Sequence, residues 1–575
     1  YAAAGALTTA PGDQVAVALR SAFGQLDATA LFLSMDSVVA HGNKATATFT
    51  ADVDLAGDGG TWRYQGSFGL VKSDGSWRVS WTPAAIVPGL LPGDRLAVVT
   101  AYPPRGHVLN SAGQPLETSA PVYVVGVVPG KLAAATATAT AFAQATGVEP
   151  DQVSGQIAAA PPGQFLTLAS LDPSSYQRLR ANLARVPGLQ VRTGLRSLYK
   201  TVATELVGTV GTEVDPALRA VGAFYVPGET IGLGGLEQAF QRQLLGVPTT
   251  EVVVLDPAGR VRTVLYKSTD GAPGQPVHTT IDAHVQDAAI AALGSVPNSG
   301  EMVAVQASTG HILAVAQHGG PVPLPSGGVL NGKLSPGTAF TIVSAAALLQ
   351  SGLAVNTPIG CTNSLSVGGQ TFTSDRSGSD KPFSADFADD CGTAFAGLSL
   401  RLNPEQFAAV VRGFGLGAGW PALPVPVFRG SVPVASGQAD LAAETIGTGN
   451  VQVSPLGMAL VAAEVDTGSW HPPCVMSDAA AGPPAGAAAP LDQTSLASLR
   501  GLMWEAVHSG AASAARTSGP SVFGQVGLTR YGSGSQWLSW FVGYRGDIAF
   551  TIVETGSSPR LSAAALAHAF AAALR

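Results

Sequence analysis

Two hydrophobic stretches that lie far apart in the chain decide the fold: GEMVAVQASTGHILAVAQ at 300–317 and WLSWFVGYRGDIAFTIVET at 537–555. Each predicts two β-strands around a turn, because runs rich in Val, Ile and aromatic residues flank Ser-Thr-Gly or Arg-Gly-Asp. Helical patterns lie between them, and a closing helix is expected over 561–574. We therefore expect one five-stranded antiparallel sheet, assembled from both hairpins, with helices on both faces.

The sequence before this sheet predicts two further domains. The first begins with a helix, followed by the strands TATFTADV (46–53), GTWRYQGSFGLVK (60–72) and GSWRVSWTP (75–83). Their period-2 alternation and their Gly and Asp-Gly turns indicate antiparallel pairing. The second alternates short strands with helices. Since 575 residues are too many for one compact core, we expect a multidomain α+β protein with domains at 1–97, 98–272 and 273–575.

Composition excludes some classes of protein. Hydrophobic residues make up 46% and charged residues 12% of the chain, and the latter is about half the usual fraction. The longest Ala/Leu-rich segment, at 561–574, is too short to span a bilayer. A net charge of −7 with only seven lysines argues against nucleic acid as a partner. The chain begins with Tyr1 rather than Met, so we expect an export signal or membrane anchor upstream.

Three cysteines, Cys361, Cys391 and Cys474, and nine scattered histidines show no zinc spacing, so neither a metal nor a cofactor is expected. Cys361 and Cys391 flank a Gly/Ser-rich loop, and a disulfide between them would stabilise the fold by roughly 3–4 kcal/mol. That pairing requires an oxidising compartment. Three unpaired buried cysteines remain the alternative.

A series of segments, in a fixed order, resembles class B penicillin-binding proteins that carry a nuclear-transport-factor-like N-terminal domain. The first matches the end of that domain, the second the Pro-Arg-Gly entry into the linker, and the others landmarks of the transpeptidase domain. In order they are GSWRVSWTPAAIVPGLLPGDRL (75–96), PPRGHVLNSAGQPLE (103–117), TTIDAHVQDAAIAAL (279–293), PGTAF (336–340), DCGTAFAGL (390–398), TGNVQVSPLGMALVAAEV (448–465), FGQVG (523–527) and WFVGY (540–544).

The resemblance implies a cone-like α+β first domain, a linker or pedestal domain of the dimerisation type, and a penicillin-binding transpeptidase-like domain. It also implies an extracytoplasmic place, anchored on the outer face of the cytoplasmic membrane. The partners would be peptidoglycan stem peptides or cell-wall synthesis proteins, and β-lactams would be the ligands of interest. The high Ala, Gly and Arg content resembles proteins of high-GC actinobacteria.

All three catalytic motifs of that family are altered here. The family uses a Ser nucleophile with a Lys one helical turn later, a Ser-x-Asn, and a Lys-Thr-Gly strand. The first motif falls on PGTAFT, with Thr338 for Ser and Thr341 for Lys. The second falls on DCG, with Asp390 for Ser and Gly392 for Asn. The third falls on QVG, with Gln525 for Lys and Val526 for Thr, while Gly527 is kept.

A shifted register does not restore these motifs. The last lysine of the chain is Lys381, so no Lys-Thr-Gly lies near 525, and Ser-x-Asn occurs nowhere. The only Ser-x-x-Lys ends at Lys200, within the expected linker domain. We interpret HSG at 508–510 as the end of a helix, because QVG has the better distance to WFVGY.

The alterations remove the proton acceptor and the cation that acyl transfer needs. Thr341 is not a base and Gln525 carries no charge, while Asp390 would oppose a substrate carboxylate. Backbone N–H groups of Thr338 and Thr529 remain as a possible oxyanion hole. We expect the Thr338 hydroxyl to cap a neighbouring N–H, the Thr341 hydroxyl to bond a carbonyl of its own helix, and Gln525 to face a narrowed cleft.

Three functions remain open on these grounds. The chain is a pseudoenzyme that acts as scaffold or regulator of wall synthesis, or a module that binds muropeptide stems or β-lactams without acylation. The third function is that of an active DD-transpeptidase that forms a covalent acyl-enzyme through Thr338. The joint loss of Lys and Ser favours the first two, in which no catalytic residue is intact.

Overall fold

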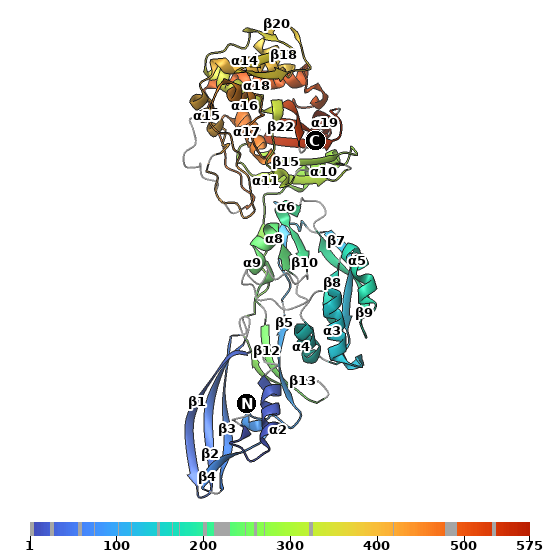
Figure 1. Cartoon of the computed structure of the whole chain (residues 1–575), viewed down its shortest axis with the longest axis vertical. Coiled ribbons are helices and arrows are strands. Elements are labelled where there is room, and N and C mark those ends of the chain that lie inside the picture. The colour runs from blue at the N-terminus through green and yellow to red at the C-terminus, as the bar shows by residue number, and fades with distance from the viewer. Residues whose placement is uncertain are drawn as a thin grey trace.

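The computed structural model contains three domains along one axis, with the N-terminus near one end and the C-terminal domain at the other (Figure 1). The residues that it describes are 5–23, 28–55, 60–73, 75–101, 103–116, 118–146, 150–160, 162–163, 165–171, 173–198, 204–211, 231–247, 249–257, 261–268, 271–320, 322, 326–417, 419–477, 491–531, 536–559 and 561–574. The predicted multidomain α+β fold is confirmed.

The N-terminal domain is a four-stranded antiparallel sheet beside one helix. The helix is α2 (Gly12–Phe23), and the strands, in spatial order, are β1 (Ala28–His41), β2 (Lys44–Leu55), β3 (Thr61–Ser73) and β4 (Ser76–Ser80). Strands β2, β3 and β4 lie where strands were predicted, and the predicted alternation of burial holds along β2 and in the first half of β3 but not in β4. Strand β1 was not predicted. The helical η1 turn (Pro83–Ala85) follows β4.

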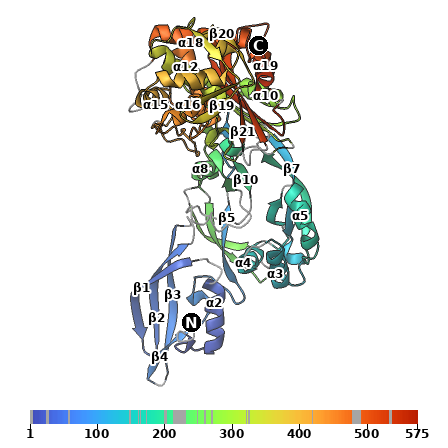
Figure 2. The same cartoon turned by 45° about the horizontal axis from the view of Figure 1, so that its top comes forward.

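The middle domain consists of a three-stranded stem and a side lobe (Figures 1 and 2). The stem pairs β5 (Arg95–Ala101), β12 (Thr249–Leu255) and β13 (Val261–Lys267). Leu96, Val252 and Val254 of this stem pack with Val53 and Trp62 of the N-terminal sheet in one buried cluster. The lobe contains β7 (Thr118–Val127), β8 (Leu166–Leu171) and β9 (Gln190–Leu198), with α3 (Ala135–Thr146), α4 (Pro150–Ala159) and α5 (Pro173–Leu183).

Short elements lead from the middle domain to the C-terminal domain. Arg105 forms an ion pair with Glu237 and donates a 2.9 Å hydrogen bond to Gln241, which ties the entry of the domain to its exit. The elements are β6 (Val108–Leu109), α6 (Thr204–Val207), β10 (Thr209–Gly211), β11 (Ile231–Leu233), α8 (Gly235–Ala239), α9 (Gln241–Leu245) and β14 (Val277–His278), the last parallel to β6.

The C-terminal domain contains the predicted five-stranded antiparallel sheet. Its spatial order joins both ends of the domain's sequence: β16 (Ile312–His318), β15 (Ser299–Gln306), β23 (Ile548–Gly556), β22 (Gln536–Arg545) and β21 (Phe523–Tyr531). Helices α10 (Ala283–Leu293) and α19 (Ala563–Ala573) pack against it, as does α17 (Pro455–Thr467). The closing helix matches the prediction for 561–574.

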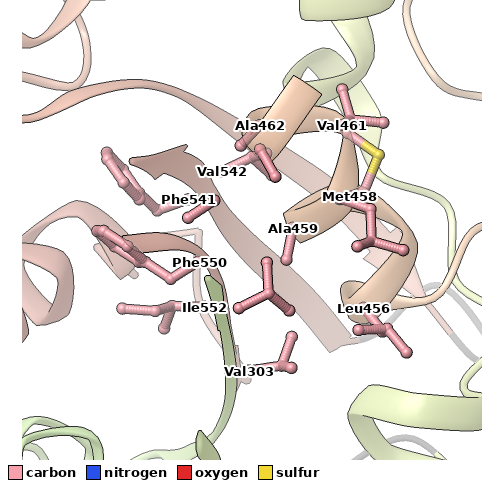
Figure 3. Packing of buried hydrophobic residues seen from close by; sticks show 14 of the residues in the cluster. Val303, Leu456, Met458, Ala459, Val461, Ala462, Phe541, Val542, Phe550 and Ile552 are labelled. Carbon is pink, nitrogen blue, oxygen red and sulfur yellow. The ribbon is translucent and has the colours of Figure 1, made fainter. Parts of the chain in front are cut away.

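Helix α17 covers one face of the sheet and forms the core of the domain. Figure 3 shows Ala459 of α17 on the side of the helix that faces Val303 and Ile552, with Met458 and Phe550 in the same cluster. The helix begins where the Ser454 side chain accepts a hydrogen bond from the Gly457 N–H, and it ends at Gly468 in the left-handed conformation. Every residue from Pro455 to Val465 is buried, because α17 lies between the sheet and the outer helices.

The remaining elements of the domain surround the segments that carry the altered motifs. They are α11 (Gly328–Asn331), η3 (Gly337–Phe340), α12 (Thr341–Gln350), β17 (Pro358–Cys361), β18 (Ser364–Val367), β19 (Gln370–Thr373), β20 (Gly378–Pro382), α13 (Phe383–Ala388), α14 (Gly392–Leu398), η4 (Ser399–Arg401), α15 (Pro404–Gly413), α16 (Gln438–Thr445), α18 (Gln493–His508) and η5 (Ser513–Ala515). No described helix has both the length and the apolar composition that crossing a membrane requires.

Candidate functional site

The turn that carries Thr338 lies directly against strand β21. Thr338 is the second residue of η3, and a Cβ added to Gly527 would be 2.5 Å from the Ala339 N. Only glycine permits this approach, which explains why Gly527 is the one residue of its motif that is kept. Gly337 donates a 3.1 Å hydrogen bond to the Gly447 carbonyl, so a second glycine turn fixes η3 from the other side.

Thr341 faces the protein interior. It is the first residue of α12, 2% exposed, and its hydroxyl donates a 2.7 Å hydrogen bond to the Thr338 carbonyl one turn earlier. The expected bond to a local carbonyl is therefore present. A side chain in this position supplies neither a proton acceptor nor a charge to the Thr338 hydroxyl.

Asp390 lies beside Thr338 and is hydrogen-bonded to it. The Thr338 hydroxyl donates to the Asp390 carboxylate. The predicted use of that hydroxyl as a helix cap is wrong, because neither η3 nor α12 has a side-chain cap hydrogen bond. Burial raises the pKa of Asp390 to about 7, although the Thr338 hydrogen bond and the positive charge of Arg376 lower it. Its other oxygen, Oδ1, is buried without a hydrogen-bond partner in the described part of the chain. A carboxyl in these surroundings is present in both protonation states near neutral pH.

The backbone at Asp390 has an unusual conformation. Its φ of 62° is the only positive value at a non-glycine residue among those described. Left-handed backbone costs an L-residue roughly 1–2 kcal/mol, and aspartate tolerates it better than most. The Asp390 N–H donates a 3.2 Å bond to the Phe387 carbonyl, and Cys391 follows at the start of α14. The turn aims the Asp390 side chain at Thr338.

Gly392 replaces an asparagine and leaves room beside Thr338. A Cβ added to Gly392 would be 3.4 Å from the Thr338 methyl group, which is ordinary van der Waals contact. A longer amide side chain at 392 would therefore reach the space around the Thr338 side chain. With glycine, the position offers no side-chain hydrogen bond to a ligand.

Gln525 does not face a cleft, which corrects the prediction. The residue is 0% exposed, its Nε2 donates a 2.7 Å bond to the Phe387 carbonyl, and its Oε1 accepts a 2.9 Å bond from the Val526 N–H. Both ends of the amide are thus used within the protein. Gln525 fastens strand β21 to the turn that carries Asp390. Val526, partly buried, pairs with Phe541 in the sheet.

Thr529 lies next to the start of η3. A Cβ on Gly337 would be 3.3 Å from the Cβ of Thr529, which pairs with Leu538 across the sheet. The two residues expected to contribute oxyanion-hole N–H groups, Thr338 and Thr529, are therefore near neighbours. Their backbone is the part of the family's catalytic apparatus that does not depend on side chains.

Cys361 and Cys391 form a disulfide, and Cys474 is buried and outside it. The disulfide joins β17 to the residue after Asp390, across a sequence separation of 30. The Asp386 carboxylate lies within 4.8 Å of both sulfurs. This group does not form a metal site in the oxidised protein, because both thiolates are consumed by the disulfide.

Two interactions at the site were not predicted from the sequence. The bond between Gln525 and Phe387 joins residues 138 positions apart, and no local pattern predicts it. Arg376, on the loop between β19 and β20, is the cation whose charge acts on Asp390. Because Arg376 is isolated in a Gly/Ser-rich loop, no sequence pattern indicated that it would lie near Asp390. Among the predicted residues, Thr338, Asp390 and Gly392 meet, while Thr341 and Gln525 are turned inward.

Comparison with known proteins assigns all three domains. Residues 1–94 match the NTF2-like N-terminal transpeptidase domain, residues 100–279 the penicillin-binding protein dimerisation domain, and residues 300–569 the penicillin-binding protein transpeptidase domain.

Three curated relatives are each similar to part of the chain. Peptidoglycan D,D-transpeptidase FtsI of Escherichia coli K12 is 28% identical over 256 residues, 42% of this chain and 40% of the relative. Peptidoglycan D,D-transpeptidase PbpA of Mycolicibacterium smegmatis is 28% identical over 226 residues, 33% of this chain and 46% of the relative. The PbpA of Mycobacterium tuberculosis H37Rv is 27% identical over 229 residues, which are 34% of this chain and 47% of the relative. The matches thus span less than half the length of each relative.

Proposed function

Because the chain belongs to the class B penicillin-binding proteins, we propose that it is a non-catalytic member that binds peptidoglycan stem peptides or cell-wall synthesis proteins. One observation carries this proposal. The side chains at both former lysine positions are bonded inside the protein, Thr341 to Thr338 and Gln525 to Phe387. Positions 341 and 525 therefore supply neither a base for the Thr338 hydroxyl nor a cation for a substrate carboxylate.

The place of action follows from the family. Penicillin-binding proteins act on the cell wall outside the cytoplasm, and the Cys361–Cys391 disulfide is stable only in an oxidising compartment. We propose that the protein is extracytoplasmic and held at the outer face of the cytoplasmic membrane by a segment that precedes this chain. Its role there is that of scaffold, regulator or stem-peptide sensor.

The first prediction is that the protein forms no stable penicilloyl adduct. Loss of a general base alone typically slows such chemistry by about 10²–10⁴-fold, and here the cation and the second hydroxyl are lost as well. The measurement is intact mass after incubation with a fluorescent penicillin, beside a penicillin-binding protein that has Ser and Lys. A stoichiometric mass increase mapped to the peptide containing Thr338 would overturn the proposal.

Binding is tested separately from chemistry. Titration calorimetry with a stem pentapeptide should give a saturable signal, and Gly392→Trp, which fills the space beside the Thr338 methyl group, should abolish it. Absence of binding by both proteins would restrict the function to that of a scaffold for other proteins.

The hydrogen bond between Thr338 and Asp390 favours a second candidate, a transpeptidase with a threonine nucleophile. In it the Thr338 oxygen attacks a peptide or β-lactam carbonyl while its proton passes to Asp390. The tetrahedral intermediate then collapses to the acyl-enzyme, and Asp390 returns the proton to the leaving nitrogen. The base form of Asp390 must be charged, so acylation would rise with pH up to about 7 and then level off. Asp390→Asn would abolish it.

A further inference from the structure

Glu205 of the middle domain reaches into the C-terminal domain. It lies on α6, and its Oε1 accepts a 3.0 Å hydrogen bond from the Val329 N–H at the start of α11, with the Leu330 N–H as a second donor. A Cβ added to Gly328 would be 2.0 Å from the Glu205 Oε2. The close fit indicates a specific contact between the two domains.

Glu301 faces the same junction from inside the sheet. Gly300 points toward Leu293 of α10, so Glu301, its neighbour on β15, points to the opposite face, which α17 and α11 cover. The residue is 0% exposed, and in the described part of the chain neither carboxylate oxygen has a hydrogen-bond partner. Oε2 of Glu205 also lacks one there. Both oxygens of Glu301 and Oε2 of Glu205 are thus buried acceptors that a proton or a cation would stabilise.

Among the described residues, no positive charge neutralises this pair. On α8, Glu237 is paired with Arg105. On β16 and β23, His318 and Glu554 are the partners of Gly300, so they share its face and point away. The ammonium of Lys333, just after α11, lies 5.4 Å from the ring centre of Phe428. The acids of α17, Glu464 and Asp466, are not among the groups that act on Glu301. Glu205 is the one charge that does.

The two carboxyls differ in how readily they lose a proton. Burial raises the pKa of Glu205 to about 7, while its two backbone N–H donors lower it. Burial and the charge on Glu205 raise the pKa of Glu301 well above its usual value. Glu205 has backbone N–H donors that stabilise its charged form, whereas Glu301 has none in the described part of the chain, so Glu205 is the first to ionise and Glu301 is the carboxyl that keeps its proton.

We propose that Glu205 and Glu301 form a proton-dependent joint that fastens the middle domain to the C-terminal domain. With a proton on Glu301, its O–H is available to the free oxygen of Glu205, and α6 stays docked on α11. When that proton is lost, two adjacent buried carboxylates repel each other without a counter-charge, and α6 withdraws Glu205 into water.

The sign of the pH dependence follows from linkage. The docked state binds a proton that the undocked state releases, so docking is strongest at low pH and weakens as pH rises toward the docked pKa of Glu301. A one-proton process changes the docking equilibrium by about tenfold per pH unit. Above pH 7, where Glu205 is already charged, the remaining dependence belongs to Glu301.

Hydrogen–deuterium exchange of the full chain between pH 7 and 9.5, corrected for intrinsic rates, tests the joint. We expect the peptide covering 327–334 to lose protection by up to tenfold per pH unit in the wild type. Glu301→Gln and Glu205→Gln should each remove this slope, because in either variant only one of the two side chains, 205 or 301, can become charged. The introduced glutamine still has an amide oxygen that accepts hydrogen bonds. Glu205→Ala should exchange rapidly at every pH. Glu464→Gln, which removes another buried acid of the same domain, is the matched control and should keep the slope.

The alternatives give different results. A wild-type peptide whose protection does not depend on pH would overturn the proposal, as would a slope that persists in Glu205→Gln. A slope abolished by millimolar calcium, with tighter protection, would replace the proton by a cation and equally overturn it. If Glu301→Gln disturbs the core, exchange rises throughout the sheet, and Glu205→Gln at the domain surface decides the question.

Discussion

At the scale of single residues, Gln525, which was predicted to occupy the family's lysine position, has a structural role. Gln525 uses its donor on the Phe387 carbonyl and its acceptor on the Val526 N–H, and both bonds lie in the interior. A buried amide whose N–H and C=O groups are both hydrogen-bonded is stable, whereas a buried lysine at this position would need an acidic partner to offset the cost of burying its charge. Gln525 therefore attaches the Asp390 turn to strand β21.

We predict that Gln525→Leu destabilises the protein by about 2–3 kcal/mol. The change leaves the Val526 N–H without its side-chain partner and removes the side-chain donor from the Phe387 carbonyl, while volume is nearly conserved. Urea denaturation monitored by tryptophan fluorescence measures the change. Val526→Thr, which restores the family's hydroxyl on the neighbouring residue, should change stability by less than about 1 kcal/mol. Equal effects of the two substitutions would show that the Gln525 bonds carry no stability.

The sequence predicted which positions meet but not which way their side chains point. Thr338, Asp390 and Gly392 were placed by the order of motifs, and they do lie together. The hydrogen bond from Thr338 to Asp390 and the inward turn of Gln525 depend on backbone conformation, including the left-handed Asp390, and on contacts between distant segments. Motif spacing contains neither kind of information.

At the scale of elements, the buried strands of the C-terminal sheet and the alternating strand β2 were predicted, whereas the largely exposed strand β1 was not. The sheet strands β15 and β23 are buried along nearly their whole length and rich in apolar residues, and β2 alternates strictly. Strand β1, by contrast, exposes large side chains such as Phe32 and Leu33, both 63% exposed, and Met35. No alternation marks it, because neither face is covered along most of its length.

The disulfide gives a prediction at this scale, because it anchors the loop between β17 and α14. Replacing both cysteines, Cys361→Ser with Cys391→Ser, should lower stability by roughly 3–4 kcal/mol through the freed loop. Calorimetry of the oxidised protein and the double variant measures the loss. Cys474→Ser, at the buried cysteine outside the disulfide, is the control and should cost about 1 kcal/mol.

Thiol counting under denaturation checks the same pairing. One reactive thiol, that of Cys474, is expected before reduction, and the full set only after it. Finding the full set in the unreduced, exported protein would contradict the disulfide.

At the scale of the whole molecule, the domains are linked by shared cores and by single contacts. The stem strands β5 and β12 complete the hydrophobic cluster of the N-terminal domain, so sequence boundaries do not separate independent cores. Toward the C-terminal domain, α6 reaches α11 through Glu205 (Figure 1). Buried acids recur in the C-terminal domain, among them Glu301, Glu444 and Glu464, each with a raised pKa.

These acids predict that stability falls as pH rises. Glu464 is 4% exposed, and burial raises its pKa from 4.5 to about 8. Between these values the folded state holds a proton that the unfolded state releases, so stability is greatest below pH 4.5 for this group and declines up to pH 8. The slope is at most about 1.4 kcal/mol per pH unit for one group. Glu464→Gln removes it, and the variant should therefore melt above the wild type at pH 8.5.

Calorimetric melting of the full chain between pH 5 and 8.5 measures this difference. Asp287→Asn, which removes an exposed carboxylate of α10, is the matched control and should follow the wild-type curve. If Glu464→Gln and wild type lose stability equally across this range, then Glu464 is charged in the folded protein. A charged Glu464 would require a counter-charge or water beside its Oε2, an atom without a hydrogen-bond partner in the described part of the chain.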